Sequence, residues 1–106
     1  MDLISREELK AKLDRGDDFK LVMTLNEWAY EAQHIPGLIN VSRFADLERS
    51  LTPQDEIVVY CSDKECIASQ VAYKILKQNG FDNVRRYEGG LSDWHAAGYA
   101  LDGKGL

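Results

Sequence analysis

The spacing of apolar residues changes repeatedly along the chain, and each change predicts a switch between strand and helix. Unbroken apolar runs are typical of short strands buried on both faces, whereas apolar residues three or four positions apart are typical of helices. The predicted strands lie at 19–24, 38–41, 57–60 and 84–87. The predicted helices lie at 6–15, 27–32, 42–51, 67–79 and 93–97. This alternation indicates an α/β fold with a mostly parallel sheet covered by helices on both faces.

Residues that commonly begin or end helices support these boundaries. Ser5 followed by Glu8 has the form of a capping box, in which the serine side chain accepts a hydrogen bond from the first turn. Gly16 and Gly80 are each placed to end the helix before them. Ser92 is expected to cap the last helix.

A reactive group is predicted where the strand at 57–60 gives way to a helix that starts at about Cys66 or Ile67. Cys61 is the first residue of the polar loop between them. Ligand sites of open α/β sheets lie at the carboxyl ends of parallel strands, and the following helix directs its free N–H groups and positive dipole end at the loop. Such a position favours the thiolate of a cysteine, whose free pKa is about 8.5. The alternative interpretation is that Cys61 is a small buried residue that ends a strand.

Composition limits the classes of protein to consider. The chain has 106 residues, 44% of them hydrophobic and 29% charged, which is typical of one soluble domain spanning 1–106 with a frayed tail from Asp102. No apolar run approaches the ~20 residues of a membrane span. The first residues are acidic where a signal peptide would be basic, so the expected location is cytoplasmic, away from the membrane.

Charge and cysteine spacing argue against nucleic acids and metals as partners. The formal charge is −5, and the pair Arg85 and Arg86 is expected to be a solvated face rather than a phosphate-binding cluster. The two cysteines do not have the paired spacing of a zinc site, although His34 and His95 could in principle complete one. No metal and no cofactor is therefore expected.

Four motifs in a fixed order resemble a known family. They are H-I-P-G-L-I-N at 34–40, I-V-V-Y-C at 57–61, N-G-F-D-N-V at 79–84 and Y-E-G-G-L-S-D-W-H-A-A-G-Y at 87–99. Together they are similar to the rhodanese family of sulfurtransferases, and the resemblance runs from about Ser5 to Leu101. It implies a five-stranded, mostly parallel sheet flanked by helices, with the Gly89–Gly90 turn beside the cysteine loop.

The resemblance also implies a reaction and its residues. Cys61 would take a sulfane sulfur from a donor such as thiosulfate or a protein persulfide, hold it as a persulfide, and pass it to a thiol or cyanide acceptor. Main-chain N–H groups of residues 62–66 would cradle the persulfide, as successive N–H groups do in anion nests. The predicted substrate-binding residues belong to the loop and the first helical turn: Ser62, Asp63, Lys64, Glu65, Cys66 and Ser69.

The loop departs from the usual pattern of the family, C-x-x-G-x-R. It is about two residues longer, lacks the glycine and the arginine, and its side chains sum to −1. A dianionic donor would lose charge-assisted hydrogen bonds and meet Asp63 and Glu65, so thiosulfate is predicted to be a poor donor compared with a neutral or protein-borne persulfide. A phosphatase-like reaction is disfavoured because Lys64 is the only cation between Cys61 and Ser69.

Two alternatives concern Cys66 and the function as a whole. Cys66 is either a resolving thiol that reacts with Cys61 or an inert residue that packs in the first helical turn. The chain is either a sulfurtransferase or a rhodanese-like binding or regulatory module without catalysis. A third possibility is a redox switch formed by the two thiols of the C-x-x-x-x-C loop.

Overall fold

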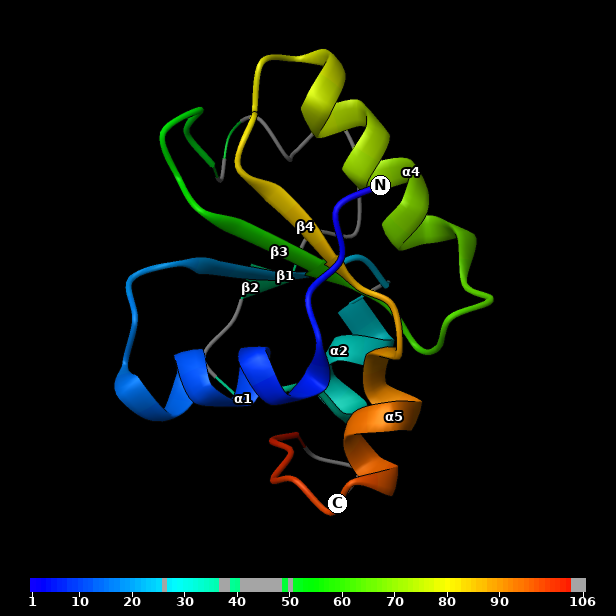
Figure 1. Ribbon diagram of the computed structural model, residues 1–106. Helices are drawn as coiled ribbons and strands as arrows, with labels where there is room; N and C mark the ends of the chain where they lie inside the picture. Colours follow the sequence, from blue (N-terminus) through cyan, green and yellow to red (C-terminus); the bar gives the residue numbers. More distant parts are fainter. Residues whose placement is uncertain (26, 37–38, 41–48, 50, 104–106) are drawn as a thin grey trace.

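A computed structural model describes residues 1–25, 27–36, 39–40, 49 and 51–103. Their centre is a parallel four-stranded sheet with the strand order β2-β1-β3-β4 (Figure 1). The strands are β1 (Lys20–Met23), β2 (Ile39–Asn40), β3 (Ile57–Tyr60) and β4 (Val84–Tyr87). All three strand pairs are parallel, which confirms the predicted α/β class.

The register of the sheet brings the carboxyl ends of three strands to one edge. Tyr60, the last residue of β3, pairs with Met23 at the end of β1 and with Tyr87 at the end of β4. All four residues of β3 are buried, which explains the unbroken apolar run of this strand. Cys61 follows Tyr60 directly, so it lies at the edge where the three strands end.

Helices cover both faces of the sheet. They are α1 (Arg6–Arg15), α2 (Glu27–Ala32), α4 (Ile67–Gln78) and α5 (Gly90–Ala96). One core cluster joins Val59 of β3 to Ala72 and Leu76 of α4, and a second joins Val58 to Leu9 of α1 and Trp94 of α5. Successive β3 residues therefore pack on opposite faces, as the strand period requires. None of the described helices is both long enough and apolar enough to cross a membrane.

The termini of α1 and α4 agree with the predicted ones. The Ser5 Oγ accepts a hydrogen bond from the Glu8 N–H at 3.0 Å, and Gly16 ends α1 in the left-handed conformation. Cys66 is the N-cap of α4, and the turn at Gly80 follows its C-cap, Asn79.

The predicted start of α5 is wrong. The helix begins at Gly90, with Gly89 as N-cap, so Ser92 lies inside the first turn and does not cap it. Its backbone N–H donates to the Ser62 carbonyl at 2.8 Å, a contact with the cysteine loop that no local pattern reveals.

Other predictions fall at the edges of the described residues. Asp102, the first residue of the predicted frayed tail, exchanges two backbone hydrogen bonds of 2.8 and 2.9 Å with His34, and residues 104–106 lie outside the described residues. The helix predicted from Ser42 falls mostly outside the described residues, and Leu51 is buried but not helical. A single parallel bridge joins Leu3 to Arg86 beyond the β4 edge, and the count of five strands stays a prediction.

Candidate functional site

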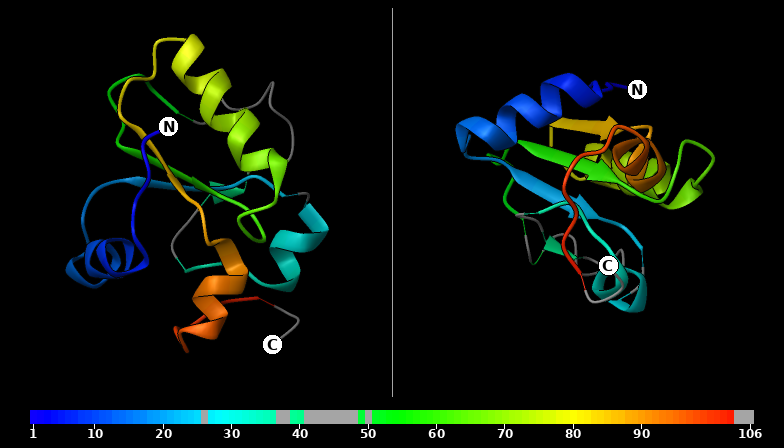
Figure 2. Two further views of the ribbon diagram at one scale, coloured as in Figure 1. Left: turned by 45° about the vertical axis from the view of Figure 1, so that its right-hand side comes forward. Right: turned by 90° about the horizontal axis from the view of Figure 1, so that it is seen from below.

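Cys61 sits at the carboxyl end of β3 and is 1% exposed. The strand end is held by Thr24, whose backbone N–H and hydroxyl both donate to the Tyr60 carbonyl at 3.1 Å. The loop that begins at Cys61 leads into α4 and lies beside the start of α5 (Figure 2). The sequence therefore placed Cys61 correctly, between a buried strand and the N-terminus of a helix.

The two cysteines of the chain form a disulfide, Cys61–Cys66. Their Cα atoms are 6.2 Å apart, within the range that disulfides commonly span. Cys66 is half-buried, whereas Cys61 is fully buried. The loop thus brings the second sulfur to the predicted nucleophile, an arrangement that favours the interpretation of Cys66 as a resolving thiol.

Asp63 organises the middle of the loop. Its carboxylate accepts a hydrogen bond from the Glu65 N–H at 3.0 Å, and its carbonyl accepts one from the Cys66 N–H at 3.2 Å. These two N–H groups were expected to cradle a persulfide, but in the disulfide form they are engaged within the loop. Of the main-chain N–H groups at 62–66 that were predicted to bind a persulfide, those of Glu65 and Cys66 are therefore already bonded within the loop.

The first turn of α5 supports the other end of the loop. The Leu91 N–H donates to the Cys61 carbonyl at 3.0 Å, next to the contact between Ser92 and Ser62. Gly90 has a φ of 63°, and a Cβ at this position would lie 2.5 Å from the Cys61 carbonyl oxygen. Only glycine fits such a close approach with a positive φ. The predicted position of the glycine turn beside the loop is thus confirmed.

Arg86 approaches the loop from the opposite side, and sequence reasoning missed it. The side chain projects from β4, is 3% exposed, and donates from Nε to the Ser69 Oγ at 2.9 Å. Its Nη2 donates to the Lys64 carbonyl at 3.0 Å and lies 3.5 Å from the Cys66 carbonyl. Its Nη1 is 3.4 Å from the Glu88 carboxylate. A buried guanidinium therefore links β4 to the loop and to the first turn of α4.

The expectation that Arg85 and Arg86 form a solvated face is wrong for Arg86. Adjacent residues of a strand point to opposite faces of the sheet. Arg85 faces α1 and forms a bidentate pair with Glu8 at 2.5 and 2.7 Å, which lowers the pKa of that carboxyl. Arg86 shares the face of Val84, toward α4. The two-residue period of a strand was the sequence signal for this difference.

Ser69 has a different position from the one predicted. It was expected to bind substrate, but it is fully buried and accepts the hydrogen bond from Arg86. Ser69 therefore supports the arginine behind the loop, and its predicted role in substrate binding stays a prediction.

A surface pocket of about 460 Å³ lies where the loop meets α5. Three of the predicted substrate-binding residues line it, while Ser62, Cys66 and Ser69 are not among its lining residues. The lining consists of Asp63, Lys64, Glu65, Gly89, Ser92, Asp93 and Ala96. Three carboxylates and one ammonium group thus make the pocket acidic.

Tyr87 fixes the carboxylate at the back of this pocket. Its hydroxyl donates to Asp93 at 2.5 Å, and Arg6 approaches the same carboxylate at 3.1 Å. Burial, together with the hydrogen bond to Asp93, raises the pKa of Tyr87. Burial likewise raises the pKa of Tyr60, whose hydroxyl accepts from the Ile35 N–H at 3.0 Å. Both tyrosines therefore stay neutral around the site.

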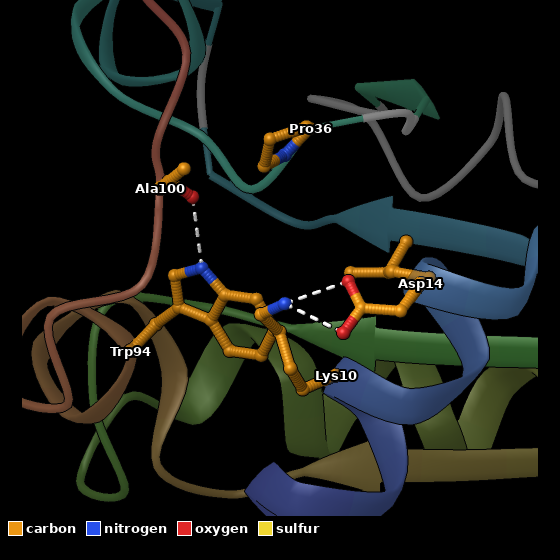
Figure 3. A pocket seen from close by; sticks show the side chains of 6 residues that line it. Lys10, Asp14, Pro36, Trp94 and Ala100 are labelled. Atoms are coloured by element: carbon orange, nitrogen blue, oxygen red, sulfur yellow. Dashed lines mark hydrogen bonds and ion pairs between the residues drawn. The ribbon is translucent and has the colours of Figure 1, made fainter.

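A second pocket, of about 330 Å³, has a different character and shares no lining residue with the first (Figure 3). The Trp94 indole N–H donates to the Ala100 carbonyl at 3.0 Å at its edge, and Lys10 pairs with Asp14. The lining consists of Lys10, Leu13, Asp14, Pro36, Trp94 and Ala100. None of these side chains is a nucleophile for sulfur.

The histidines are not gathered with the cysteines. The His34 Nδ1 is 2.8 Å from the Tyr30 carbonyl, and the His34 ring stacks on Tyr30. His95 is exposed on α5. Within the described ranges, no group of three or more His, Cys, Asp or Glu side chains is placed to hold a metal ion.

Comparisons with known proteins identify relatives along nearly the whole chain. The profile described as "Rhodanese-like domain" matches residues 5–97. HTH-type transcriptional regulator Rv0324 of Mycobacterium tuberculosis is 34% identical over 103 residues, which cover 95% of this chain and 45% of that protein. The candidate sulfur carrier protein YrkF of Bacillus subtilis is 29% identical over 94 residues, which cover 86% of this chain and 49% of that protein. The chain spans about half the length of these curated relatives.

A solved structure has the same arrangement of helices and strands. Thiosulfate sulfurtransferase from Pseudomonas aeruginosa superposes with a TM-score of 0.82 at 26% identity, over 98% of this chain and 20% of that one. The resemblance seen in the four motifs is thus confirmed by the profile and by the fold. The chain belongs to the rhodanese-like domain family.

Proposed function

We propose that this domain carries sulfane sulfur as a persulfide on Cys61 and transfers it to a thiol or cyanide acceptor. The observation that carries the proposal is the position of Cys61 between the buried end of β3 and the N-terminus of α4. The family includes sulfurtransferases, and the relatives include a thiosulfate sulfurtransferase and a candidate sulfur carrier protein.

The reaction needs Cys61 as a thiolate, so the disulfide must first be reduced. The thiolate attacks the outer sulfur of a donor persulfide, and the donor leaves as a thiolate. An acceptor thiolate or cyanide then attacks the outer sulfur on Cys61, and the Cys61 thiolate leaves. The partial positive charge at the start of α4 stabilises this thiolate both as nucleophile and as leaving group. One transfer is thereby divided into two covalent steps.

The acidic pocket supports a choice of donor. Asp63, Glu65 and Asp93 line the pocket beside the loop, and Lys64 is the one cation among its described lining residues. The Arg86 guanidinium is occupied by carbonyl and hydroxyl oxygens behind the loop. A dianion such as thiosulfate therefore meets repulsion in this pocket, and no arginine is among its described lining residues to bind it. A neutral donor, or a persulfide on a protein with a basic surface, suits this pocket better.

Intact mass spectrometry tests the proposal. The reduced protein is incubated with cysteamine persulfide, a donor without carboxylates, under nitrogen and then freed of small molecules. A gain of one sulfur atom in Cys66→Ser, absent from Cys61→Ser, is the expected result. Neither variant gaining sulfur would contradict a persulfide carrier.

A second candidate is a redox-sensing regulatory module. The Mycobacterium tuberculosis relative is an HTH-type transcriptional regulator, and the Cys61–Cys66 disulfide provides a chemical switch. This candidate predicts that mild oxidation of the dithiol removes two hydrogens, while a sulfane donor leaves no sulfur on either cysteine. The same mass measurement separates the two functions.

A further inference from the structure

We propose that Cys66 resolves the Cys61 persulfide within the same chain, which releases sulfide and closes the Cys61–Cys66 disulfide. The domain would then reduce sulfane sulfur to sulfide at the expense of a dithiol, an activity distinct from transfer to an external acceptor. This inference rests on the proposed formation of a persulfide at Cys61.

The geometry that carries the inference is the meeting of the two sulfurs across the loop. They are bonded to each other while the loop remains held by its neighbours. On one side, α5 binds the carbonyls of Cys61 and Ser62, and on the other, Arg86 binds the carbonyl of Lys64. Sulfur contact is therefore compatible with both anchors of the loop. The Cys61 Sγ, the inner sulfur of a persulfide, lies within reach of Cys66 without a large movement of the backbone.

The step balances as a thiol–disulfide exchange. The Cys66 thiolate attacks the Cys61 Sγ, and a new bond forms between the two protein sulfurs. The bond from the Cys61 Sγ to the outer sulfur breaks, and the outer sulfur leaves with the electron pair as hydrosulfide. The sulfane sulfur is reduced, and the two cysteines are oxidised to the disulfide.

A dithiol reductant completes the cycle. One of its thiolates attacks the Cys66 sulfur, because Cys66 is half-buried while Cys61 is 1% exposed. Cys61 then leaves as the thiolate next to the N-terminus of α4, which favours its departure. The second thiol of the reductant displaces Cys66 from the mixed disulfide. The net reaction converts one sulfane sulfur and one dithiol into sulfide and one disulfide.

The pocket favours this internal acceptor over an external one. A small thiolate acceptor is an anion, and the acidic pocket beside the loop, lined by Asp63, Glu65 and Asp93, repels it. Cys66 belongs to the same loop as Cys61 and needs no diffusion to reach it. An oriented internal nucleophile also has a very high effective molarity compared with a reagent in solution. Cys66 should therefore react before most external acceptors arrive.

The test follows sulfide and protein mass together. Fully reduced protein is freed of reductant under nitrogen and mixed with one equivalent of cysteamine persulfide, a donor without carboxylates, with a protein-free blank for spontaneous sulfide release. The wild-type chain is expected to release about one sulfide per disulfide formed, by the stoichiometry of the exchange. Cys66→Ser should keep the added sulfur and release sulfide at least about 100-fold more slowly, given the loss of an oriented nucleophile.

A mixing control tests whether the step is intramolecular. Cys66→Ser carrying the persulfide is mixed with Cys61→Ser, which still has Cys66. Release should remain slow at micromolar protein, since the two cysteines are no longer in one loop. Fast release from this mixture would overturn the intramolecular mechanism.

The outcomes separate the inference from the proposed function. A wild-type chain that retains the sulfur as stably as Cys66→Ser overturns the inference and leaves the persulfide carrier intact. If no sulfur reaches the wild type or a folded Cys66 variant, and no sulfide is released, both proposals fail. Circular dichroism checks folding, and Cys66→Ala replaces the serine variant if that one unfolds. The ratio of sulfide to disulfide in the wild type shows whether each released sulfide consumes one protein dithiol, and the mixing control decides whether the step is intramolecular.

Discussion

Replacement of Arg86 by methionine should loosen the cysteine loop far more than the same change at Arg85. The two arginines are neighbours in β4, but Arg86 makes buried contacts whereas Arg85 makes partly exposed ones. Arg86 is buried and donates to the Ser69 hydroxyl and the Lys64 carbonyl at 2.9 and 3.0 Å. Arg85 forms a partly exposed ion pair with Glu8 and also donates to the Leu3 carbonyl at 3.2 and 3.3 Å. Arg85→Met is thus a matched control for charge, strand position and side-chain length.

The magnitude follows from the hydrogen bonds that are lost. Hydrogen bonds to a charged group contribute about 1.5–3 kcal/mol each, and Arg86 makes two short ones. Removing a buried charge also removes its desolvation cost, which offsets part of the loss. We therefore expect Arg86→Met to lower the free energy of unfolding by about 2–4 kcal/mol. Arg85→Met should lower it by about 0.2–1 kcal/mol, the usual range for exposed pairs.

Two measurements on each variant check this prediction. Urea unfolding of the oxidised protein gives the free energy of unfolding, and equilibration with a glutathione redox buffer gives the tendency of Cys61 and Cys66 to pair. Arg86→Met should lower both the free energy of unfolding and the tendency of the two cysteines to pair, because the carbonyl of Lys64 loses its donor beside the loop. Arg86→Lys should fall between the wild type and Arg86→Met, since it keeps the charge but not the forked donors. Equal losses in Arg86→Met and Arg85→Met would refute the role assigned to Arg86.

Three further expectations concern the glycine turn, the pocket and the response to acid. Gly90→Ala should lower the free energy of unfolding in urea by at least about 2 kcal/mol, because alanine at φ 63° is strained and its Cβ would meet the Cys61 carbonyl. A loss below about 0.5 kcal/mol, the size of a neutral surface change, would contradict this. Replacement of Asp63 and Glu65 by their amides should raise kcat/KM for thiosulfate about tenfold in an assay of thiocyanate formation, while an unchanged value would exclude repulsion by these carboxylates. The Glu8 carboxyl has a pKa below its ordinary value of 4.5, first because of the hydrogen bond from Arg85, so the stability from this pair is present above pH 4.5 and is lost as the pH falls through the folded-state pKa. Unfolding free energies across the acidic range should therefore fall less steeply in Arg85→Met than in the wild type, and parallel curves would rule out this linkage.

The sequence by itself determined the order of the described elements and the position of Cys61. An unbroken apolar run such as 57–60 belongs to a buried parallel strand, and a change to helical spacing marks α4. The bounds of α1 followed from Ser5 and Gly16, because capping depends on residues only a few positions apart. These features are local, so a pattern within about ten residues contains the information needed to predict them.

Only the tertiary structure decided what surrounds the cysteine. Arg86 reaches the loop because β4 lies next to β3 in the sheet, and the start of α5 at Gly90 is coupled to the Cys61 and Ser62 carbonyls. The backbone of Asp102 pairs with that of His34, which is far away along the chain. Such contacts depend on strand order and on the face to which each side chain points. Spacing along the chain predicts which residues form a strand, but the partners of a buried charge are set by the packing of segments that are distant in sequence.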